Sequence, residues 1–124
     1  MTQSLEDYLE MVSFLADDGE VRVTDIAARL HVSKPSVFTA LKVLEDQGLI
    51  EHKRYRTVLL TQQGARRAAE IRARHRFLTE FLRDVVGVNA DIAEKDACKM
   101  EHLLSEETLL KMKIFAKGKI RSER

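Results

Sequence analysis

The sequence predicts a mainly α-helical protein, in which a winged helix-turn-helix domain is followed by a second, helical domain. Glycine and proline are scarce, with five Gly and one Pro in 124 residues. Apolar residues recur at helical spacing through most of the chain. Two short helical patterns are joined by a tight turn, and two strand-like runs around a basic segment follow them. These parts, in this order, predict the winged helix.

The composition excludes several other classes of protein. No apolar run reaches the roughly 18 residues of a membrane span, and no basic-then-apolar leader opens the chain. We therefore expect a cytoplasmic protein without a membrane partner. The single cysteine cannot form an internal disulfide, which suits a reducing compartment.

Charge is unevenly distributed although the net charge is only +1. The first twenty residues contain six acidic side chains and no lysine or arginine, whereas residues 66–76 contain five arginines. Such asymmetry is typical of nucleic-acid binding. Solvated helix faces explain it equally well.

The first predicted helix covers residues 3–17, where apolar residues follow the 3.6-residue period of an amphipathic helix. Asp7 and Glu10 point away from the apolar stripe. Because they are three residues apart, both carboxylates can face one site. The alternative is that both acids are simply solvated.

The helix-turn-helix follows the break at Asp17-Asp18-Gly19. Thr24 is expected to cap a short helix within residues 21–32. Ser33 is expected to cap the next helix, which has Pro35 in its first turn. Gly48 is expected to end that second helix.

Residues 49–53 and 57–60 are predicted to form two short strands, with the basic wing between them. Serine and threonine on the outward face of the second helix can bond phosphates or base edges, and lysines attract phosphates. Because this face lacks the Arg, Asn or Gln that usually read bases, we expect shape-assisted recognition. The predicted DNA-binding residues are Ser33, Lys34, Pro35, Ser36, Thr39 and Lys42 on the helix and Arg54, Tyr55 and Arg56 in the wing.

Three helices are predicted after the wing. Thr61 is expected to cap a long helix that runs to about residue 86 despite Gly64. The next helix starts at Ala90 or Asp91, and Ser105 is expected to cap the last one.

A metal-binding pattern lies in the predicted helix that contains Cys98, Glu101 and His102. Spacing of i, i+3 and i+4 puts a thiolate, a carboxylate and an imidazole on one helix face. All three are ligands for divalent transition metals. Each residue alone has a simpler explanation, such as a buried thiol or a surface acid, but together they predict a metal site. The predicted ligands are Asp7, Glu10, His75, Cys98, Glu101 and His102.

The run VTDIAARLHVSKPSVFTALKVLEDQGLIEHKRY resembles the DNA-binding domain of the diphtheria-toxin-repressor superfamily of metal-dependent regulators. The resemblance continues through SLEDYLE near the N-terminus, RARHRFLTEFL in the long helix and DACKMEHLLSEET beyond it. It implies a DNA-binding domain at 1–62, a linker helix at 63–76 and a metal-binding dimerisation domain at 77–124. The chain is too short for the SH3-like domain of iron-type members and is similar to the shorter manganese-regulator type.

The resemblance also assigns roles to the predicted ligands. Asp7 and Glu10 match carboxylates of the manganese branch, Cys98 matches the iron branch, and His75 matches a second-site histidine in both. Glu94 falls where the iron branch has a second-site histidine, so it could join Glu10 and His75. The resemblance implies a homodimer, with an interface that could include Phe77, Phe81, Leu103, Leu104, Leu109 and Leu110. The alternative is that these residues close only the core of one subunit.

These observations predict a repressor that binds double-stranded operator DNA, with Mn²⁺ or Fe²⁺ as corepressor; Co²⁺, Ni²⁺ and Zn²⁺ could bind in vitro. The first alternative is a metal-independent winged-helix regulator that senses a small molecule or redox state through Cys98. A hydrolase with Glu101 as base is less well supported, because the sequence has no HExxH motif or phosphate-cradling loop. A closed structural zinc site would need more Cys and His residues.

Overall fold

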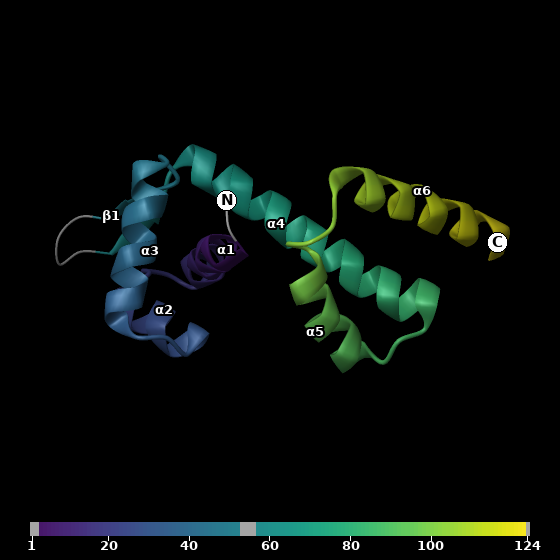
Figure 1. Ribbon diagram of the computed structural model, residues 1–124, viewed down its shortest axis with the longest axis horizontal. Helices are drawn as coiled ribbons and strands as arrows, with labels where there is room; N and C mark the ends of the chain where they lie inside the picture. Colours follow the sequence, from purple (N-terminus) through teal and green to yellow (C-terminus); the bar gives the residue numbers. More distant parts are fainter. Residues whose placement is uncertain (1–2, 53–56, 124) are drawn as a thin grey trace. The chain divides into compact units, whose positions relative to one another are not determined.

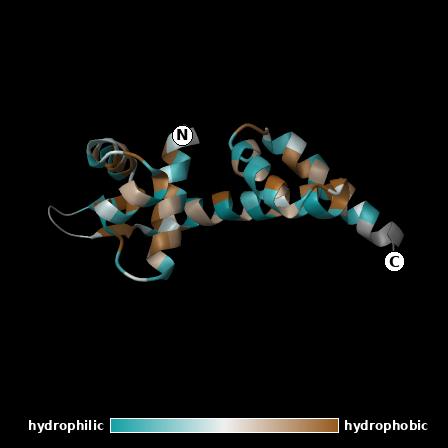
Figure 2. Cartoon of the chain, turned by 90° about the horizontal axis from the view of Figure 1, so that it is seen from below, coloured by the Kyte–Doolittle hydropathy of each residue, from teal (hydrophilic) through white to brown (hydrophobic). Residues whose placement is uncertain are grey.

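The computed structural model describes residues 3–52 and 57–123, and the chain divides into two compact units, Met1–Arg72 and Ala73–Arg124 (Figure 1). The boundary lies inside a long helix, α4 (Gln62–Glu80), which includes the predicted linker segment 63–76. All the helices carry hydrophilic as well as hydrophobic residues (Figure 2). Among the described residues, none of the helices is long and apolar enough to cross a membrane.

The first unit begins with three helices, α1 (Gln3–Asp17), α2 (Val23–Leu30) and α3 (Lys34–Asp46). Their apolar faces pack together around fully buried residues. The predicted cap of α3 is confirmed, because the Ser33 hydroxyl accepts a hydrogen bond from the backbone N–H of Ser36 at 3.2 Å. The main buried side chains of this core are Leu9, Val12, Ile26, Val37, Leu41, Leu44 and Ile71.

The predicted cap of α2 is wrong. The helix begins at Val23, and Arg22 occupies the N-cap position without a side-chain hydrogen bond. The backbone N–H groups of Asp25 and Ile26 both donate to the carbonyl of Arg22 at 3.1 Å, which places Thr24 inside the first turn.

The wing consists of two antiparallel strands, β1 (Ile50–His52) and β2 (Val58–Leu60). They are shorter than predicted but lie at the predicted places. An isolated bridge between Val21 and Val58 joins the strands to the segment before α2. Gly48 has a φ of +75° after α3, which confirms its predicted role as the stop. The predicted wing contacts Arg54, Tyr55 and Arg56 lie outside the described residues.

Thr61 makes hydrogen bonds both to the segment that follows α3 and to the first turn of α4. Its hydroxyl accepts from the N–H of Gly64 at 3.0 Å and donates to the carbonyl of Gly48 at 2.7 Å. The N–H of Thr61 donates to the carbonyl of Leu49 at 3.1 Å. The predicted cap is confirmed, and it also fixes the direction in which α4 leaves the wing.

Arg72 fastens α4 to α1 within the first unit. Its guanidinium donates to the Ser13 hydroxyl at 3.1 Å, lies 3.0 Å from the Asp17 carboxylate and sits 4.3 Å from the centre of the Phe14 ring. The Arg72 side chain is 28% exposed, so these contacts are partly shielded from water. Ile71, the preceding residue, is fully buried in the core.

Replacing Arg72 with alanine is expected to lower the free energy of unfolding by about 1–2 kcal/mol, because a partly shielded ion pair, a hydrogen bond and a cation–π contact are lost together. Urea denaturation followed by circular dichroism measures this. Arg67→Ala is the matched control, because the ion pair of Arg67 within the described residues is with exposed Glu70, at 3.5 Å on the same helix. It should cost less than about 0.5 kcal/mol. Equal losses in both variants would contradict the role assigned to Arg72.

The second unit contains the end of α4, a π-helical segment η1 (Phe81–Val86) and the helices α5 (Ala90–Met100) and α6 (Glu106–Glu123). Gly87, with a φ of +90°, ends the helical run. Side chains cap both later helices: the Asn89 amide oxygen accepts from Asp91 N–H at 3.0 Å, and the Ser105 hydroxyl accepts from Thr108 N–H at 3.1 Å. The predicted starts of both helices are confirmed.

The core of the second unit is small. Leu78, Ala97 and Leu109 are buried, and partly buried apolar side chains surround them. Leu103 and Leu110, by contrast, are 75% and 57% exposed. Of the predicted interface residues, Leu109 therefore belongs to the core of one subunit, whereas Leu103 and Leu110 remain available to a second copy of the chain.

Candidate metal centre and DNA-binding surface

The outward face of α3 carries the predicted DNA-binding residues. The cap residue and the helix residues predicted to contact DNA are all exposed, as the helical period predicts. They are Ser33, Lys34, Pro35, Ser36, Thr39 and Lys42. The exposure leaves this face of the recognition helix open to a ligand the size of a DNA duplex.

Several polar groups on this face already have local partners. The hydroxyls of Ser33 and Ser36 lie 2.9 Å apart, and the Thr39 hydroxyl donates to the carbonyl of Pro35 at 3.0 Å. Lys42 lies 3.4 Å from Asp46. A hydroxyl that donates locally can still accept a hydrogen bond. These residues are therefore better suited to phosphate contacts that position the helix than to bidentate hydrogen bonds with a base.

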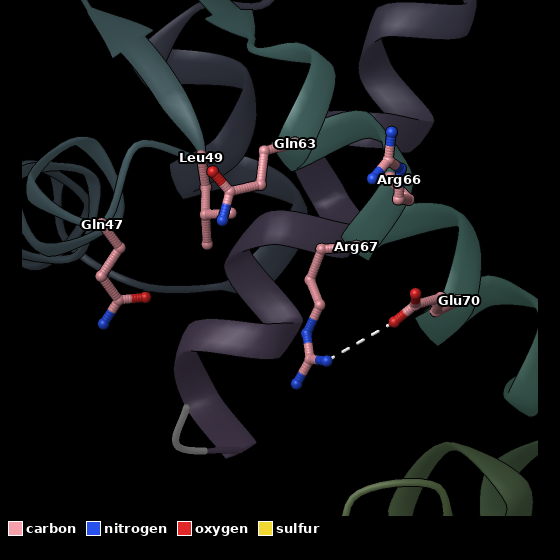
Figure 3. Close-up of a pocket in the computed structure, with 6 residues that line it drawn as sticks. All are labelled: Gln47, Leu49, Gln63, Arg66, Arg67 and Glu70. Carbon is pink, nitrogen blue, oxygen red and sulfur yellow. Dashed lines mark hydrogen bonds and ion pairs between the residues drawn. The ribbon is translucent and has the colours of Figure 1, made fainter.

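A shallow pocket of about 340 Å³ lies where the end of α3 approaches the start of α4 (Figure 3). Its lining contains no cysteine, serine or histidine, and Arg67 pairs with Glu70 beside it. The pocket therefore offers no nucleophile with an adjacent base. Its lining residues are Gln47, Leu49, Gln63, Arg66, Arg67 and Glu70.

A buried carboxylate between two imidazoles is the main chemical feature of the second unit. Glu101 is 1% exposed. Its Oε1 lies 3.1 Å from Nε2 of His102, and its Oε2 lies 3.4 Å from Nδ1 of His75. Burying a carboxylate costs desolvation free energy unless cationic groups compensate its charge. Carboxylate and imidazole donors together fit a divalent transition metal.

The local fold explains how Glu101 and His102 are presented. α5 ends at Met100, and the N–H of Glu101 still donates a helical hydrogen bond to the carbonyl of Ala97 at 3.0 Å. The chain then turns at 101–104 before Ser105 caps α6. The prediction that one regular helix carries all three residues is wrong in this detail, because Glu101 and His102 both lie in the turn after α5. The side chains of Glu101 and His102 nevertheless meet, as their spacing predicts.

The remaining predicted ligands differ in exposure. Cys98 and Glu94 are exposed on α5. In the first unit, Glu10 is buried, with 6% exposure, and Asp7 is half-buried one helical turn before it. The burial of Glu10 contradicts the alternative that both acids of the first helix are solvated. The part of these four residues in metal binding remains a prediction.

Sequence reasoning missed one aromatic pair on the DNA-binding surface. Phe38 on α3 is 51% exposed, and its ring stacks on that of His52 in β1. The signal was present in the sequence: Phe38 lies four residues from both Lys34 and Lys42, and therefore on the same outward face.

A winged helix-turn-helix with an open recognition helix, followed by a helical unit in which a buried glutamate lies between two histidines, is the arrangement of a metal-responsive DNA-binding regulator. Two family models cover most of the chain. The N-terminal DNA-binding domain of iron-dependent repressors matches residues 1–58, and their metal-binding and dimerisation domain matches residues 61–117. The chain belongs to the iron-dependent repressor family.

Individual relatives agree with this assignment. The transcriptional regulator MntR of Escherichia coli is 46% identical over 112 residues, which cover 90% of this chain and 72% of MntR. The structure of the manganese regulator SloR has a TM-score of 0.79 at 28% identity, covering 94% of this chain and 55% of that one. A manganese-dependent transcriptional repressor in complex with manganese has a TM-score of 0.77 at 29% identity, covering 87% and 50%. The chain thus spans about half the length of these two solved chains.

These comparisons confirm the predicted family, the mainly helical winged-helix fold and the metal-dependent class of regulator. The family's second domain binds metal and dimerises, as predicted for the part of the chain after the wing.

Proposed function

We propose that the chain is a homodimeric transcriptional repressor that acts in the cytoplasm and binds its operator more tightly when Mn²⁺ or Fe²⁺ is bound. The observation that supports this most directly is the buried Glu101 carboxylate beside His75 and His102, in a chain with an exposed recognition helix. We assign no enzymatic activity to the chain.

The proposed ligands come from both halves of the chain. His75, Glu101 and His102 would hold the ion from the second unit, and Asp7 and Glu10 would do so from α1. Cys98 and Glu94 are proposed as further donors. A bound divalent ion supplies positive charge that compensates carboxylates from both units. A shared set of ligands would favour one relative orientation of the two units over others, which is how a ligand shifts a conformational equilibrium.

The effect on DNA follows from dimer geometry. In a two-fold dimer the two α3 helices read half-sites about one helical turn apart. A change in the angle between the DNA-binding and dimerisation domains alters that spacing, so a modest hinge motion changes operator affinity. We place the domains at 1–62 and 77–124, with the linker helix at 63–76 between them.

The hard donors of the proposed site favour Mn²⁺ or Fe²⁺, and the thiolate decides how far softer ions compete. Asp7, Glu10 and Glu101 supply hard carboxylate oxygens, which suit both ions. A thiolate from Cys98 would favour Fe²⁺, Co²⁺, Ni²⁺ or Zn²⁺. A Cys98→Ser variant that keeps its response to Mn²⁺ but loses its response to Fe²⁺ would place the thiolate in the site.

Operator affinity is expected to rise by roughly 10- to 100-fold when Mn²⁺ or anaerobic Fe²⁺ is added, a typical range for coupling between two sites. The experiment is a fluorescence-anisotropy titration of a labelled operator duplex at fixed ionic strength, with Co²⁺ and Zn²⁺ in parallel. Addition of EDTA should reverse the effect, and Mg²⁺, which prefers oxygen-only octahedral sites, is the control ion. Binding that ignores all four transition metals would contradict the proposal.

The main alternative is a winged-helix regulator that senses redox state or a small molecule through exposed Cys98. His102→Ala separates the two functions. The metal-dependent repressor loses its response in this variant, whereas a thiol sensor keeps its response and loses it in Cys98→Ser.

A further inference from the structure

An aromatic side chain lies in the middle of the face that α3 presents to DNA. Phe38 is 51% exposed, although its neighbour Val37 is fully buried. Lys34 and Lys42 lie four residues before and after it, and both are exposed. Residues four apart on a helix form one ridge. The phenyl ring is therefore flanked by two cations that can contact phosphates.

The phenyl ring has a fixed support. It stacks on the imidazole of His52, with ring centroids 5.9 Å apart and an interplanar angle of 27°. The strand that carries His52 is tied to the same helix, because the His52 backbone N–H donates to the Glu45 carboxylate at 3.0 Å. The Phe38 ring thus has an aromatic partner within the same unit, which restricts its orientation before any ligand binds.

The chemistry of the surrounding groups points to the kind of contact that this ring can make. Ser33 and Ser36 bond each other, and Thr39 donates to Pro35, so the hydroxyls are partly used within the helix. An exposed phenyl group cannot read a donor or an acceptor. In the major groove, the apolar feature of a base edge is the 5-methyl group of thymine.

We propose that Phe38 is a specificity-determining residue that contacts the 5-methyl group of a thymine in each operator half-site, and that His52 is its positioning residue. This inference rests on the proposed DNA-binding function but goes beyond it, because it names the base that the recognition helix prefers. It also explains how a helix without outward Arg, Asn or Gln could read sequence directly.

A purely structural role for the pair is the competing explanation. The Phe38–His52 stack could serve only to hold β1 against α3. If the pair has only that role, replacing Phe38 or His52 should lower the affinity for a thymine operator and for the matching uracil operator by the same factor. The two operators differ only in the 5-methyl group. The ratio of the two affinities therefore separates the explanations.

The experiment uses the full chain in saturating Mn²⁺ and an operator selected by the wild-type chain from a random duplex library. Each thymine is replaced in turn by deoxyuridine, and dissociation constants are measured for the wild type, Phe38→Ala and His52→Ala. Val43→Ala is the matched control, because Val43 is a 36% exposed apolar residue of the same helix. Circular dichroism checks that each variant folds.

At one position in each half-site, uracil should weaken wild-type binding by about fourfold, the effect of one buried methyl group. Phe38→Ala should bind the two duplexes equally, His52→Ala should show a reduced ratio, and Val43→Ala should keep the wild-type ratio. If Phe38→Ala keeps the wild-type ratio at every position, the inference is overturned while the repressor function stands. If the wild-type chain selects no operator with any of the metals, the proposed function fails first, and the inference fails with it.

Discussion

Replacing Glu101 with glutamine should remove the metal response of the chain. Glu101 is buried, and each of its carboxylate oxygens lies close to a different imidazole, His102 at 3.1 Å and His75 at 3.4 Å. Glutamine keeps the shape of the side chain but loses the negative charge and one acceptor oxygen. Because an altered outer-shell partner alone costs 10- to 100-fold in metal affinity, loss of a direct ligand should cost about 100-fold or more.

Isothermal titration with Mn²⁺ and Co²⁺ measures this loss directly, and operator titration measures its consequence. Glu107→Gln is the matched control, because Glu107 is an exposed carboxylate in the first turn of α6 in the same unit. Its metal affinity should equal that of the wild type. A Glu101→Gln variant that binds metal normally would remove Glu101 from the ligand set, and the proposed site would have to be rebuilt around other residues.

Local rules predicted much of the fold from the sequence. The caps at Ser33, Thr61 and Ser105 each depend on a side-chain oxygen three residues before the backbone N–H that it accepts from. Such contacts are complete within one turn of a helix, so no knowledge of the rest of the chain is needed. The apolar period of α1 and the stop at Gly48 are likewise local.

Features that depend on contacts between distant parts of the chain could not be predicted in this way. Arg72 donates to Ser13 across 59 positions of sequence, and no periodicity links them. The end of α5 at Met100 could not be read from the helical spacing of Cys98, Glu101 and His102, because that spacing continues past the last residue of the helix. The sequence identified Glu101 as a ligand candidate, but its burial beside two imidazoles appears only in the folded chain.

Gly64 is a further feature that depends on a contact outside its own helix. Helix propensity predicts that alanine at this position stabilises the chain, whereas the fold predicts that it destabilises the chain. By helix propensity alone, a glycine in the first turn of α4 is unfavourable, because alanine stabilises a helix interior by up to about 1 kcal/mol relative to glycine. The fold supplies the reason for the glycine. A Cβ at position 64 would overlap the carbonyl oxygen of Leu49 and lie 2.8 Å from its carbonyl carbon. That carbonyl is backbone, and it already accepts the N–H of Thr61 at 3.1 Å.

Gly64→Ala is therefore expected to destabilise the chain by roughly 3 kcal/mol, since the start of α4 and the segment after α3 must separate to make room for the methyl group. Gly118→Ala in α6 is the matched control, because a Cβ there meets nothing within 4 Å. That variant should be unchanged or more stable by up to about 1 kcal/mol, as propensity predicts. Urea denaturation of both variants tests the contrast. If Gly64→Ala proves as stable as Gly118→Ala, the close approach between Gly64 and Leu49 cannot be what determines how α4 leaves the wing.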